Sequence, residues 1–149
     1  MAASRRPGSP RVLPPVAERL ARVATRVLRW ERPRGARTRV ELTLLDAAAM
    51  RRLNRRVTGR RGLTDVIAFT LPQPDGRVLG DVYVCPDAAR RYIAQVTNGG
   101  SPTLADELVR LTVHGTLHVL GYDHPTGPGR TRSAMWRRQE RYVRRLLHG

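Results

Sequence analysis

The segment LADELVRLTVHGTLHVLGYDH, residues 104–124, gives the strongest structural signal in the chain. Apolar residues recur within it at spacings of three and four, which is the period of an amphipathic α-helix. We therefore predict a helix from Leu104 to Leu120. Its buried stripe is expected to consist of Val109, Val113, Leu117 and Leu120, widened by Leu104, Leu108 and Leu111.

Three of the four histidines of the chain lie at the end of this helix, as His114, His118 and His124. His114 and His118 are four residues apart, so a helix places their rings on one face, about 6 Å apart along its axis. Gly121 can adopt the left-handed backbone conformation that ends helices, which lets the chain turn and bring His124 back. The spacing predicts that the three imidazoles bind one metal ion.

Three imidazoles with a fourth position open are typical of a catalytic zinc site, whereas structural zinc sites favour four protein ligands and thiolates. The single cysteine, Cys85, can build neither a four-thiolate site nor an internal disulfide. We therefore expect one catalytic divalent ion per chain, with Zn²⁺ as the default. Three imidazoles also accept nickel, copper or iron. The alternative is that the histidines are ordinary helix and loop residues.

The histidine pattern H-x-x-x-H-x-x-G-x-x-H is shared with the metzincin metalloproteases. Those enzymes also require a glutamate directly after the first histidine as general base, and Gly115 occupies that position here. Glycine cannot carry a proton, so a zinc metallopeptidase is the least favoured function. Phosphodiester cleavage fits better, because a metal can polarise a phosphoryl oxygen while arginines neutralise the developing charge.

The charge balance of the chain indicates a nucleic-acid partner. There are 28 basic residues, all of them arginine, against 12 acidic residues, which gives a net charge of +16. Guanidinium groups pair bidentately with phosphate, and a field of this sign attracts polyanions with little sequence discrimination. The alternative is that the charge reflects genome composition and only keeps the protein in solution.

Length and hydropathy indicate one soluble domain. A chain of 149 residues fits a single hydrophobic core. No apolar run approaches the roughly 18 to 20 residues of a membrane-spanning helix, and no apolar secretory segment follows Arg5 and Arg6. We expect a cytoplasmic protein with a flexible basic N-terminal arm over residues 1–15 and a single domain over residues 16–149.

The other periodicities predict a small sheet and further helices. Helices are expected over residues 16–30, 47–55, 86–96 and 132–147, and strands over residues 39–44, 66–71 and 78–84, the last two joined by a Pro74-Asp75-Gly76 turn. Asp46 is expected to cap a helix, and residues 56–62 to form a basic loop. Residues 98–102 are expected to form a connector. Asp65 and Asp81 stand at the expected starts of strands, where a cap or turn role is favoured over a role as an acid or base in catalysis.

The sequence HGTLHVLGYDH resembles the signature of the YbeY family, the bacterial endoribonucleases of rRNA maturation. Further resemblance lies in Leu53-Asn54, in residues 64–69, in Gly80-Asp81-Val82, and in Met135 and Glu140. It covers residues 53–140. The resemblance implies an α+β fold, a single compact domain with a small mixed β-sheet packed by about five helices and a metal site at the end of a central helix.

The resemblance also implies a function. His114, His118 and His124 would be both the metal ligands and the catalytic residues of a single-strand-specific endoribonuclease. It would act in maturation of the 16S rRNA 3′ end and in ribosome quality control, with RNA and the ribosome or ribosomal proteins as partners and no membrane or small organic cofactor. The alternative is a noncatalytic ribosome-assembly factor whose metal stabilises the fold and whose basic surface binds rRNA.

One position departs from the family's pattern. Many relatives place an arginine, thought to help catalysis, where this chain has Thr58. Either a neighbouring arginine reaches the phosphate instead, or these flexible side chains face solvent. Asp123, beside His124, either orients a ligand imidazole or bonds to the backbone of its own turn. The arginines concerned are Arg55, Arg56, Arg60 and Arg61.

Overall fold

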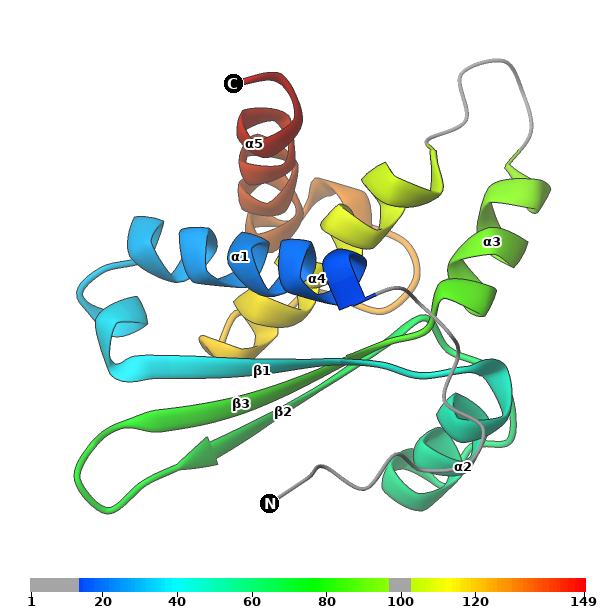
Figure 1. The fold of residues 1–149 in the computed structure, drawn as a ribbon, viewed down its shortest axis with the longest axis horizontal. Helices are drawn as coiled ribbons and strands as arrows, with labels where there is room; N and C mark the ends of the chain where they lie inside the picture. Colours follow the sequence, from blue (N-terminus) through cyan, green and yellow to red (C-terminus); the bar gives the residue numbers. More distant parts are fainter. Residues whose placement is uncertain (1–13, 97–102) are drawn as a thin grey trace.

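A computed structural model describes residues 14–96 and 103–149 of the chain (Figure 1). Within these residues the helices are α1 (Pro14–Trp30), α2 (Ala47–Thr58), α3 (Pro86–Gln95), α4 (Leu104–Val119) and α5 (Ala134–His148), with two 3-10 turns, η1 (Arg34–Arg37) and η2 (Arg130–Arg132). The strands are β1 (Thr38–Leu44), β2 (Val66–Pro72) and β3 (Val78–Val84). Residues 1–13 of the predicted arm and the whole predicted connector lie outside the described residues.

The sheet has three strands in the order β1-β3-β2. β1 runs parallel to β3, with Val40 opposite Gly80, and β2 runs antiparallel to β3, with Ala68 opposite Val82. The β2–β3 hairpin turns where the sequence predicts it, at a glycine with φ of 86°, Gly76. The prediction of an α+β domain with a small mixed sheet packed by five helices is confirmed.

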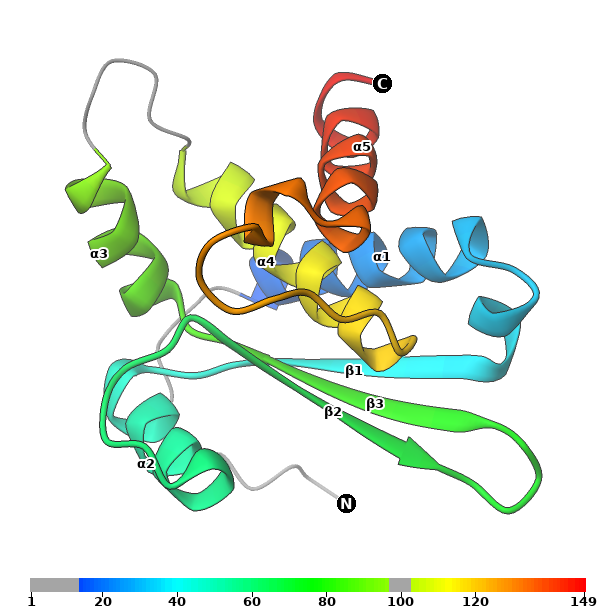
Figure 2. The same ribbon diagram turned by 180° about the vertical axis from the view of Figure 1, so that it is seen from behind.

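Helix α4 forms the centre of the hydrophobic core. It lies against one face of the sheet and contacts α1, α3 and α5 as well as β2 and β3 (Figures 1 and 2). Every residue from Glu107 to Leu117 except Arg110 is buried. The apolar surface that these elements remove from water drives the packing and fixes the position of the helix end. The buried apolar residues of α4 are Leu108, Val109, Leu111, Val113, Leu117 and Val119.

Two glycines let α4 approach the sheet closely. A Cβ atom on Gly115 would lie 2.6 Å from Cγ1 of Val82 in β3, and one on Gly80 would lie 2.3 Å from Cγ1 of Val119. Neither side chain would fit without movement of its neighbour. The glycine after the first histidine therefore has a packing role in addition to excluding a general base.

Several boundaries differ from the sequence prediction. α1 begins at Pro14, two residues earlier than expected, and β1 begins at Thr38, one residue earlier. The turn η2 precedes a slightly shorter α5. α2 continues to Thr58, so the prediction of a loop from Arg56 is wrong. The helix ends only at Gly59, whose φ of 72° lets its N–H bond to the Arg55 carbonyl.

The predictions for the three aspartates near element ends have different outcomes. Asp46 caps α2 as predicted, because its side chain accepts a hydrogen bond from the Ala49 N–H at 2.8 Å. Asp65 directly precedes β2, whereas Asp81 lies within β3 between Glu41 and Phe69, so its predicted place at a strand start is wrong. None of the described helices combines the length and apolar character needed to cross a bilayer.

Candidate metal centre

The end of α4 positions the histidine motif by a regular helix-capping arrangement. Gly121 has a φ of 98°, its N–H donates to the His118 carbonyl at 2.9 Å, and the Tyr122 N–H donates to the Leu117 carbonyl at 3.1 Å. This pair of bonds is the Schellman motif, which requires a left-handed residue and so favours glycine. The guanidinium of Arg34 donates to the Leu120 carbonyl at 2.6 Å. The chain therefore reverses direction as predicted.

The reversal brings all three imidazoles together. Nε2 of His114 lies 3.0 Å from Nε2 of His118 and 3.3 Å from Nε2 of His124. Among the described residues these three form the one group of potential metal ligands, with all ligand atoms within 4.8 Å of one another. Two nitrogen ligands of a tetrahedral zinc ion, each bound at about 2.05 Å, are separated by about 3.3 Å. The observed spacing fits such an ion.

The hydrogen bonds of the Nδ1 atoms determine which ring nitrogen can bind a metal. Nδ1 of His118 lies 3.0 Å from the Tyr122 carbonyl, and Nδ1 of His124 lies 2.9 Å from the Pro125 carbonyl. A carbonyl can only accept, so both Nδ1 atoms carry the proton. Nδ1 of His114 lies 2.6 Å from Oε1 of Gln139, whose own Nε2 donates to Glu140. The same tautomer is therefore assigned to His114.

In that tautomer the Nε2 atom of a neutral imidazole offers only a lone pair. Three lone pairs that converge at about this spacing repel one another. A cation between them removes this repulsion, because each lone pair can then coordinate the cation. The donor set is thus chemically suited to a divalent ion that accepts imidazole ligands. Among the residues that the structure describes, no further histidine, cysteine or carboxylate joins this group of ligands.

Electrostatics keep two of the rings neutral. Burial lowers the pKa of His114 to about 4, and the positive charge of His118, His124 and Arg130 adds to this, although the hydrogen bond to Gln139 opposes it. Burial also lowers the pKa of His118, assisted by His124. Metal binding requires the neutral imidazole, so both shifts reduce competition from protons.

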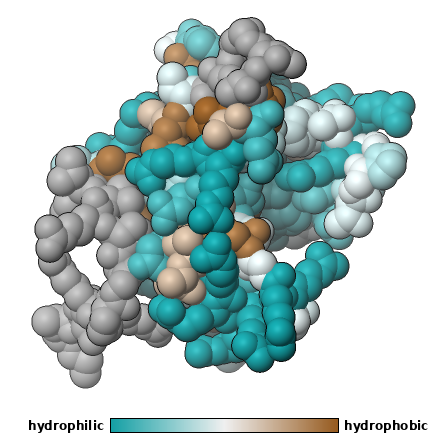
Figure 3. Space-filling model, turned by 90° about the vertical axis from the view of Figure 1, so that its right-hand side faces the viewer, coloured by the Kyte–Doolittle hydropathy of each residue, from teal (hydrophilic) through white to brown (hydrophobic). Residues whose placement is uncertain are grey.

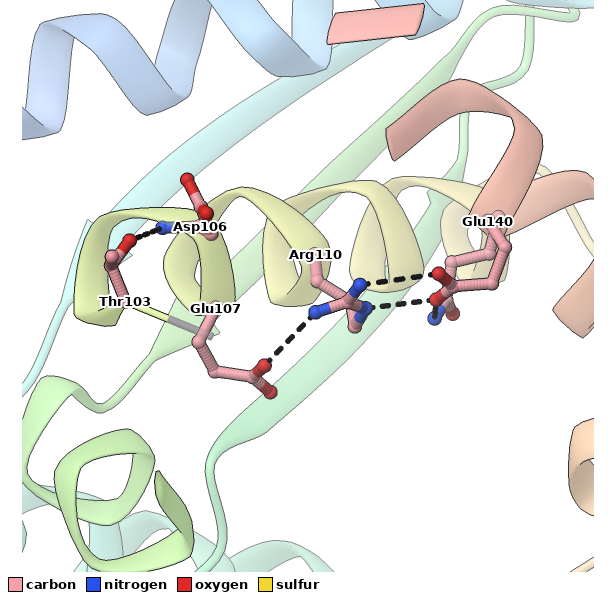
Figure 4. Close-up of polar contacts among 6 residues, drawn as sticks. Thr103, Asp106, Glu107, Arg110 and Glu140 are labelled. Atoms are coloured by element: carbon pink, nitrogen blue, oxygen red, sulfur yellow. Dashed lines mark hydrogen bonds and ion pairs between the residues drawn. The ribbon is translucent and has the colours of Figure 1, made fainter. Parts of the chain in front are cut away.

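A partly buried polar network centred on Arg110 joins α4 to α5 (Figure 4). Arg110 donates to both carboxylate oxygens of Glu140, at 2.8 and 3.1 Å, and to Glu107 at 3.3 Å. Glu140 in turn accepts from Gln139 at 3.2 Å, and Gln139 holds His114. The bidentate pair fixes α5 against α4, so the amide that orients the ring is itself held in place.

A second network anchors the segment that carries His124. The Tyr122 hydroxyl donates to the carboxylate of Glu31, at the end of α1, at 2.5 Å. Tyr142 and Arg138 of α5 donate to the other oxygen of the same carboxylate. Burial opposes ionisation of Glu31, but the hydrogen bonds from Tyr122 and Tyr142 outweigh it, and its pKa is lowered. The end of α1 and helix α5 thus hold the turn whose carbonyl at Tyr122 orients His118.

A groove of about 690 Å³ opens beside the triad. His114, Gly115 and His118 form one part of its wall, and the segment after α2 forms another. Asn54 and Thr58 shape that segment, because the Asn54 amide donates to the Gly62 carbonyl at 3.2 Å and the Thr58 hydroxyl donates to the Asn54 carbonyl at 2.8 Å.

Only two of the four candidate arginines line the groove. Arg60 and Arg61 line it, whereas Arg55 and Arg56 are exposed on α2 and do not. Asp123 is exposed, and its carboxylate accepts from the backbone N–H of His124 at 2.8 Å. This bond to its own turn is one of the two predicted roles of Asp123, and the orientation of a ligand imidazole stays a prediction.

The site residues that sequence patterns do not predict include Gln139, Glu31 and Arg130. A signal existed for Gln139, because it occupies the apolar stripe of α5 between Met135 and Val143, where an amide needs a specific partner. Glu31 follows α1 directly and carries no pattern of its own. Its partners Tyr122 and Tyr142 are 91 and 111 residues away in the sequence.

Comparison with known proteins agrees with this architecture. A model of the family described as Endoribonuclease YbeY matches residues 14–147. The Endoribonuclease YbeY of Mycolicibacterium gilvum is 40% identical over 96 residues, which cover 57% of this chain and 52% of that protein. That of Mycobacterium tuberculosis is 38% identical with the same coverage. The chain thus spans about half the length of the curated relatives it matches.

A solved structure supports the same relationship. The solution structure of a Thermotoga maritima protein has a TM-score of 0.61 and 28% sequence identity, covering 89% of this chain and 81% of that one. The family match extends over α1 to α5 and includes the whole histidine motif. The sequence resemblance, the fold and the convergent triad therefore lead to one conclusion: the chain belongs to the YbeY family.

Proposed function

We propose that this protein is a metal-dependent endoribonuclease that cleaves single-stranded RNA. The observation that carries the proposal is the convergence of three Nε2 lone pairs, 3.0 and 3.3 Å apart, beside an arginine-lined groove whose wall includes His114 and His118. The curated relatives named Endoribonuclease YbeY support the choice of substrate. The net charge of +16 supports it further, because RNA is a polyanion.

Each residue of the site has a role in this proposal. His114, His118 and His124 hold the ion, most simply Zn²⁺, and are the catalytic residues. When bound, a divalent ion supplies a Lewis acid that stabilises negative charge on the phosphodiester. Arg60 and Arg61 pair with phosphate oxygens along the groove, in place of the family arginine missing at Thr58. Asp123 keeps the His124 turn in shape.

Peptide hydrolysis is disfavoured on two grounds. Gly115 cannot act as the general base that metzincins place there. The contact of Gly115 with β3 also leaves no space for a glutamate, because its Cβ would lie 2.6 Å from Val82. An assay on unfolded protein substrates with added zinc should therefore detect no metal-dependent proteolysis.

The proposal is tested by RNA cleavage with matched histidine variants. Purified wild-type protein should cleave a single-stranded RNA when loaded with zinc, and the activity should disappear in His114→Ala. His148→Ala is the matched control, because His148 is exposed at the end of α5, away from the triad. Metal analysis should find one ion per chain in the wild type and none in the triple His114/His118/His124→Ala variant.

The outcomes separate the two candidate functions. Cleavage that persists at the wild-type rate in His114→Ala would contradict catalysis by the triad and point to a contaminating nuclease. A wild type that binds RNA and metal but cleaves nothing, and that loses thermal stability on chelation, would instead be a ribosome-assembly factor with a structural metal.

We further propose that the RNA is ribosomal, that the protein acts in the cytoplasm on the 3′ end of 16S rRNA and in ribosome quality control, and that it works in contact with the ribosome or ribosomal proteins. This part rests on family membership. It predicts that cells lacking the protein accumulate 16S precursor extended at the 3′ end, and that the His114→Ala gene fails to correct this.

A further inference from the structure

The segment between the histidine motif and α5 carries an arginine and a tryptophan that the preceding proposal does not use. It returns along α4 before α5 begins (Figure 2). Two glycines with left-handed backbone, Gly127 and Gly129, shape it, and the Ser133 hydroxyl donates to the Arg130 carbonyl at 2.8 Å. Ser133 also caps α5 by accepting from the Trp136 N–H at 3.1 Å. Arg130 and Trp136 are thus presented on an ordered turn.

The two side chains form a pair. The guanidinium carbon of Arg130 lies 5.8 Å from the centre of the Trp136 ring, within the range of a cation–π contact. Trp136 is partly exposed and Arg130 is exposed. Among the described residues no carboxylate forms an ion pair with Arg130, whereas Arg110 and Arg138 are neutralised by Glu140 and Glu31. Its charge is available to a ligand.

The pair lies next to the metal centre. Trp136 precedes Gln139 by three residues on α5, so the two share a helix face, and Gln139 holds His114. The charge of Arg130 acts on His114, on His118 and on Asp65, which lies between the groove residues Thr64 and Val66. Because Arg130 contacts the ring of Trp136, and Trp136 shares a face of α5 with the residue that holds His114, the pair lies close to the triad.

We propose that Arg130 and Trp136 form an RNA-binding subsite beside the triad, in which the indole stacks on one unpaired base and the guanidinium pairs with the adjoining phosphate. An aromatic ring beside an unpaired guanidinium is the arrangement that binds single strands, because every base offers a π face and every nucleotide a phosphate. A base within a duplex is already stacked on both faces. The subsite thus gives a physical reason for a preference for single strands, and it rests on the proposed function.

The chain contains an internal control for this subsite. Trp30 also lies beneath two arginines, with Arg26 at 5.3 Å and Arg145 at 4.4 Å from the ring centre, but its ring stacks on Tyr142 at 5.1 Å. Arg26→Gln removes the same charge over the same kind of ring as Arg130→Gln. A comparison of RNA affinity between the two variants therefore distinguishes a local binding subsite from the general electrostatic attraction of RNA to a basic protein.

Binding is measured without catalysis, in metal-free His114→Ala protein, so that the outcome does not depend on RNA cleavage. In a Trp30→Phe background Trp136 is the sole tryptophan, and a single-stranded oligonucleotide should quench its fluorescence. Trp136→Ala and Arg130→Gln should each weaken single-strand binding about 10-fold. Arg26→Gln should change it less than about twofold, and duplex binding should respond equally to Arg130→Gln and Arg26→Gln.

Two results would overturn the subsite: Trp136 fluorescence that RNA leaves unchanged, or equal losses of single-strand affinity in Arg130→Gln and Arg26→Gln. Arg130→Gln alters an exposed side chain, so it remains informative if Trp136→Ala weakens the fold. Quenching by RNA in a protein whose wild type does not cleave would support the subsite and contradict the endoribonuclease.

Discussion

Gln139 is the residue that connects the core of the protein to its metal centre. Its side chain is buried, with 1% of the residue exposed, and its Oε1 accepts from Nδ1 of His114 at 2.6 Å. Carboxamide and carbonyl partners of this kind fix the tautomer of a ligand imidazole and make it a better metal ligand. His118 and His124 use backbone carbonyls for the same purpose. Only the orientation of His114 can therefore be removed by a side-chain substitution.

Replacing Gln139 should weaken metal binding without touching a ligand. In Gln139→Leu the Nδ1–H of His114 loses its acceptor in a buried place, and zinc affinity should fall about 10- to 100-fold. Competition with a chromophoric chelator measures this. Gln95→Leu, at the exposed end of α3, is the matched control. Equal affinity in the Gln139 and Gln95 variants would show that the amide does not act on the metal centre.

The pKa of His114 predicts how the metal-free protein responds to acid. Burial holds this pKa at about 4, below its ordinary value of 6.5, so the unfolded chain binds the proton more readily than the folded one. The contribution of His114 to the free energy of unfolding is fully present above pH 6.5, where the ring is neutral in both states. It is lost as the pH falls toward 4, because only the unfolded chain then binds the proton. The shift corresponds to about 3 kcal/mol of unfolding free energy.

Urea unfolding of the chelated protein between pH 7 and pH 4 measures this loss. His114→Asn should lose less stability over the same range, because it has no ring to protonate. Parallel stability curves for the wild type and the variant would contradict the assignment of the pH dependence to His114. Metal must be absent throughout, since bound metal competes with the proton for the same nitrogen.

At the level of elements, the sequence predicts what depends on local periodicity and misses what depends on distant contacts. The α4 stripe and the Gly121 turn follow from spacing and from a residue that tolerates positive φ, and both predictions are confirmed. The predicted end of α2 is too early, because neither Arg56 nor Thr58 stops a helix and the stop signal is Gly59. The Glu31 network joins α1, α5 and the Tyr122 turn, and no spacing rule relates such positions.

The contact between α4 and β3 gives a prediction at the same scale. In Gly115→Ala the added methyl would lie 2.6 Å from Cγ1 of Val82, so the helix or the valine must move. The cost should be about 1 to 3 kcal/mol of unfolding free energy. Val82→Ala removes the obstructing carbons, and the double variant Gly115→Ala/Val82→Ala should be less destabilised than the sum of the two single variants.

Chemical denaturation of the four proteins measures the coupling between these two sites. Strict additivity would mean that Gly115 is not in steric contact with Val82. The same comparison for Gly80→Ala and Val119→Ala tests the second close approach, where the distance is 2.3 Å. Because His114 directly precedes Gly115, Gly115→Ala should also weaken zinc binding. Gly115→Ala/Val82→Ala should recover part of the zinc affinity.

At the scale of the whole molecule, charge determines how RNA is attracted and the groove determines where it is held. Hydrophilic side chains dominate the coloured part of the face in Figure 3, and hydrophobic ones form small groups between them. The net charge of +16 was available from the sequence, but the separation of Arg60 and Arg61 from Arg55 and Arg56 was not. All four are arginines within seven residues, and only the end of α2 assigns them to different surfaces.

Salt dependence separates these two contributions. Each phosphate contact to a single strand adds about 0.7 to the slope of log affinity against log salt concentration. A strand that makes about five such contacts should therefore lose on the order of 100-fold in affinity between 50 and 200 mM salt. Arg60→Gln/Arg61→Gln should reduce the slope by about 1.4, because two contacts disappear.

Arg55→Gln/Arg56→Gln removes the same charge from α2 outside the groove and should leave the slope within about 0.3 of the wild-type value. Fluorescence anisotropy with a labelled single-stranded oligonucleotide and metal-free His114→Ala protein gives both slopes without cleavage. If the two pairs reduce the slope equally, RNA is held by the overall field and not by the groove. A selective loss in the Arg60/Arg61 variant would place the phosphate backbone along the wall that leads to His114 and His118.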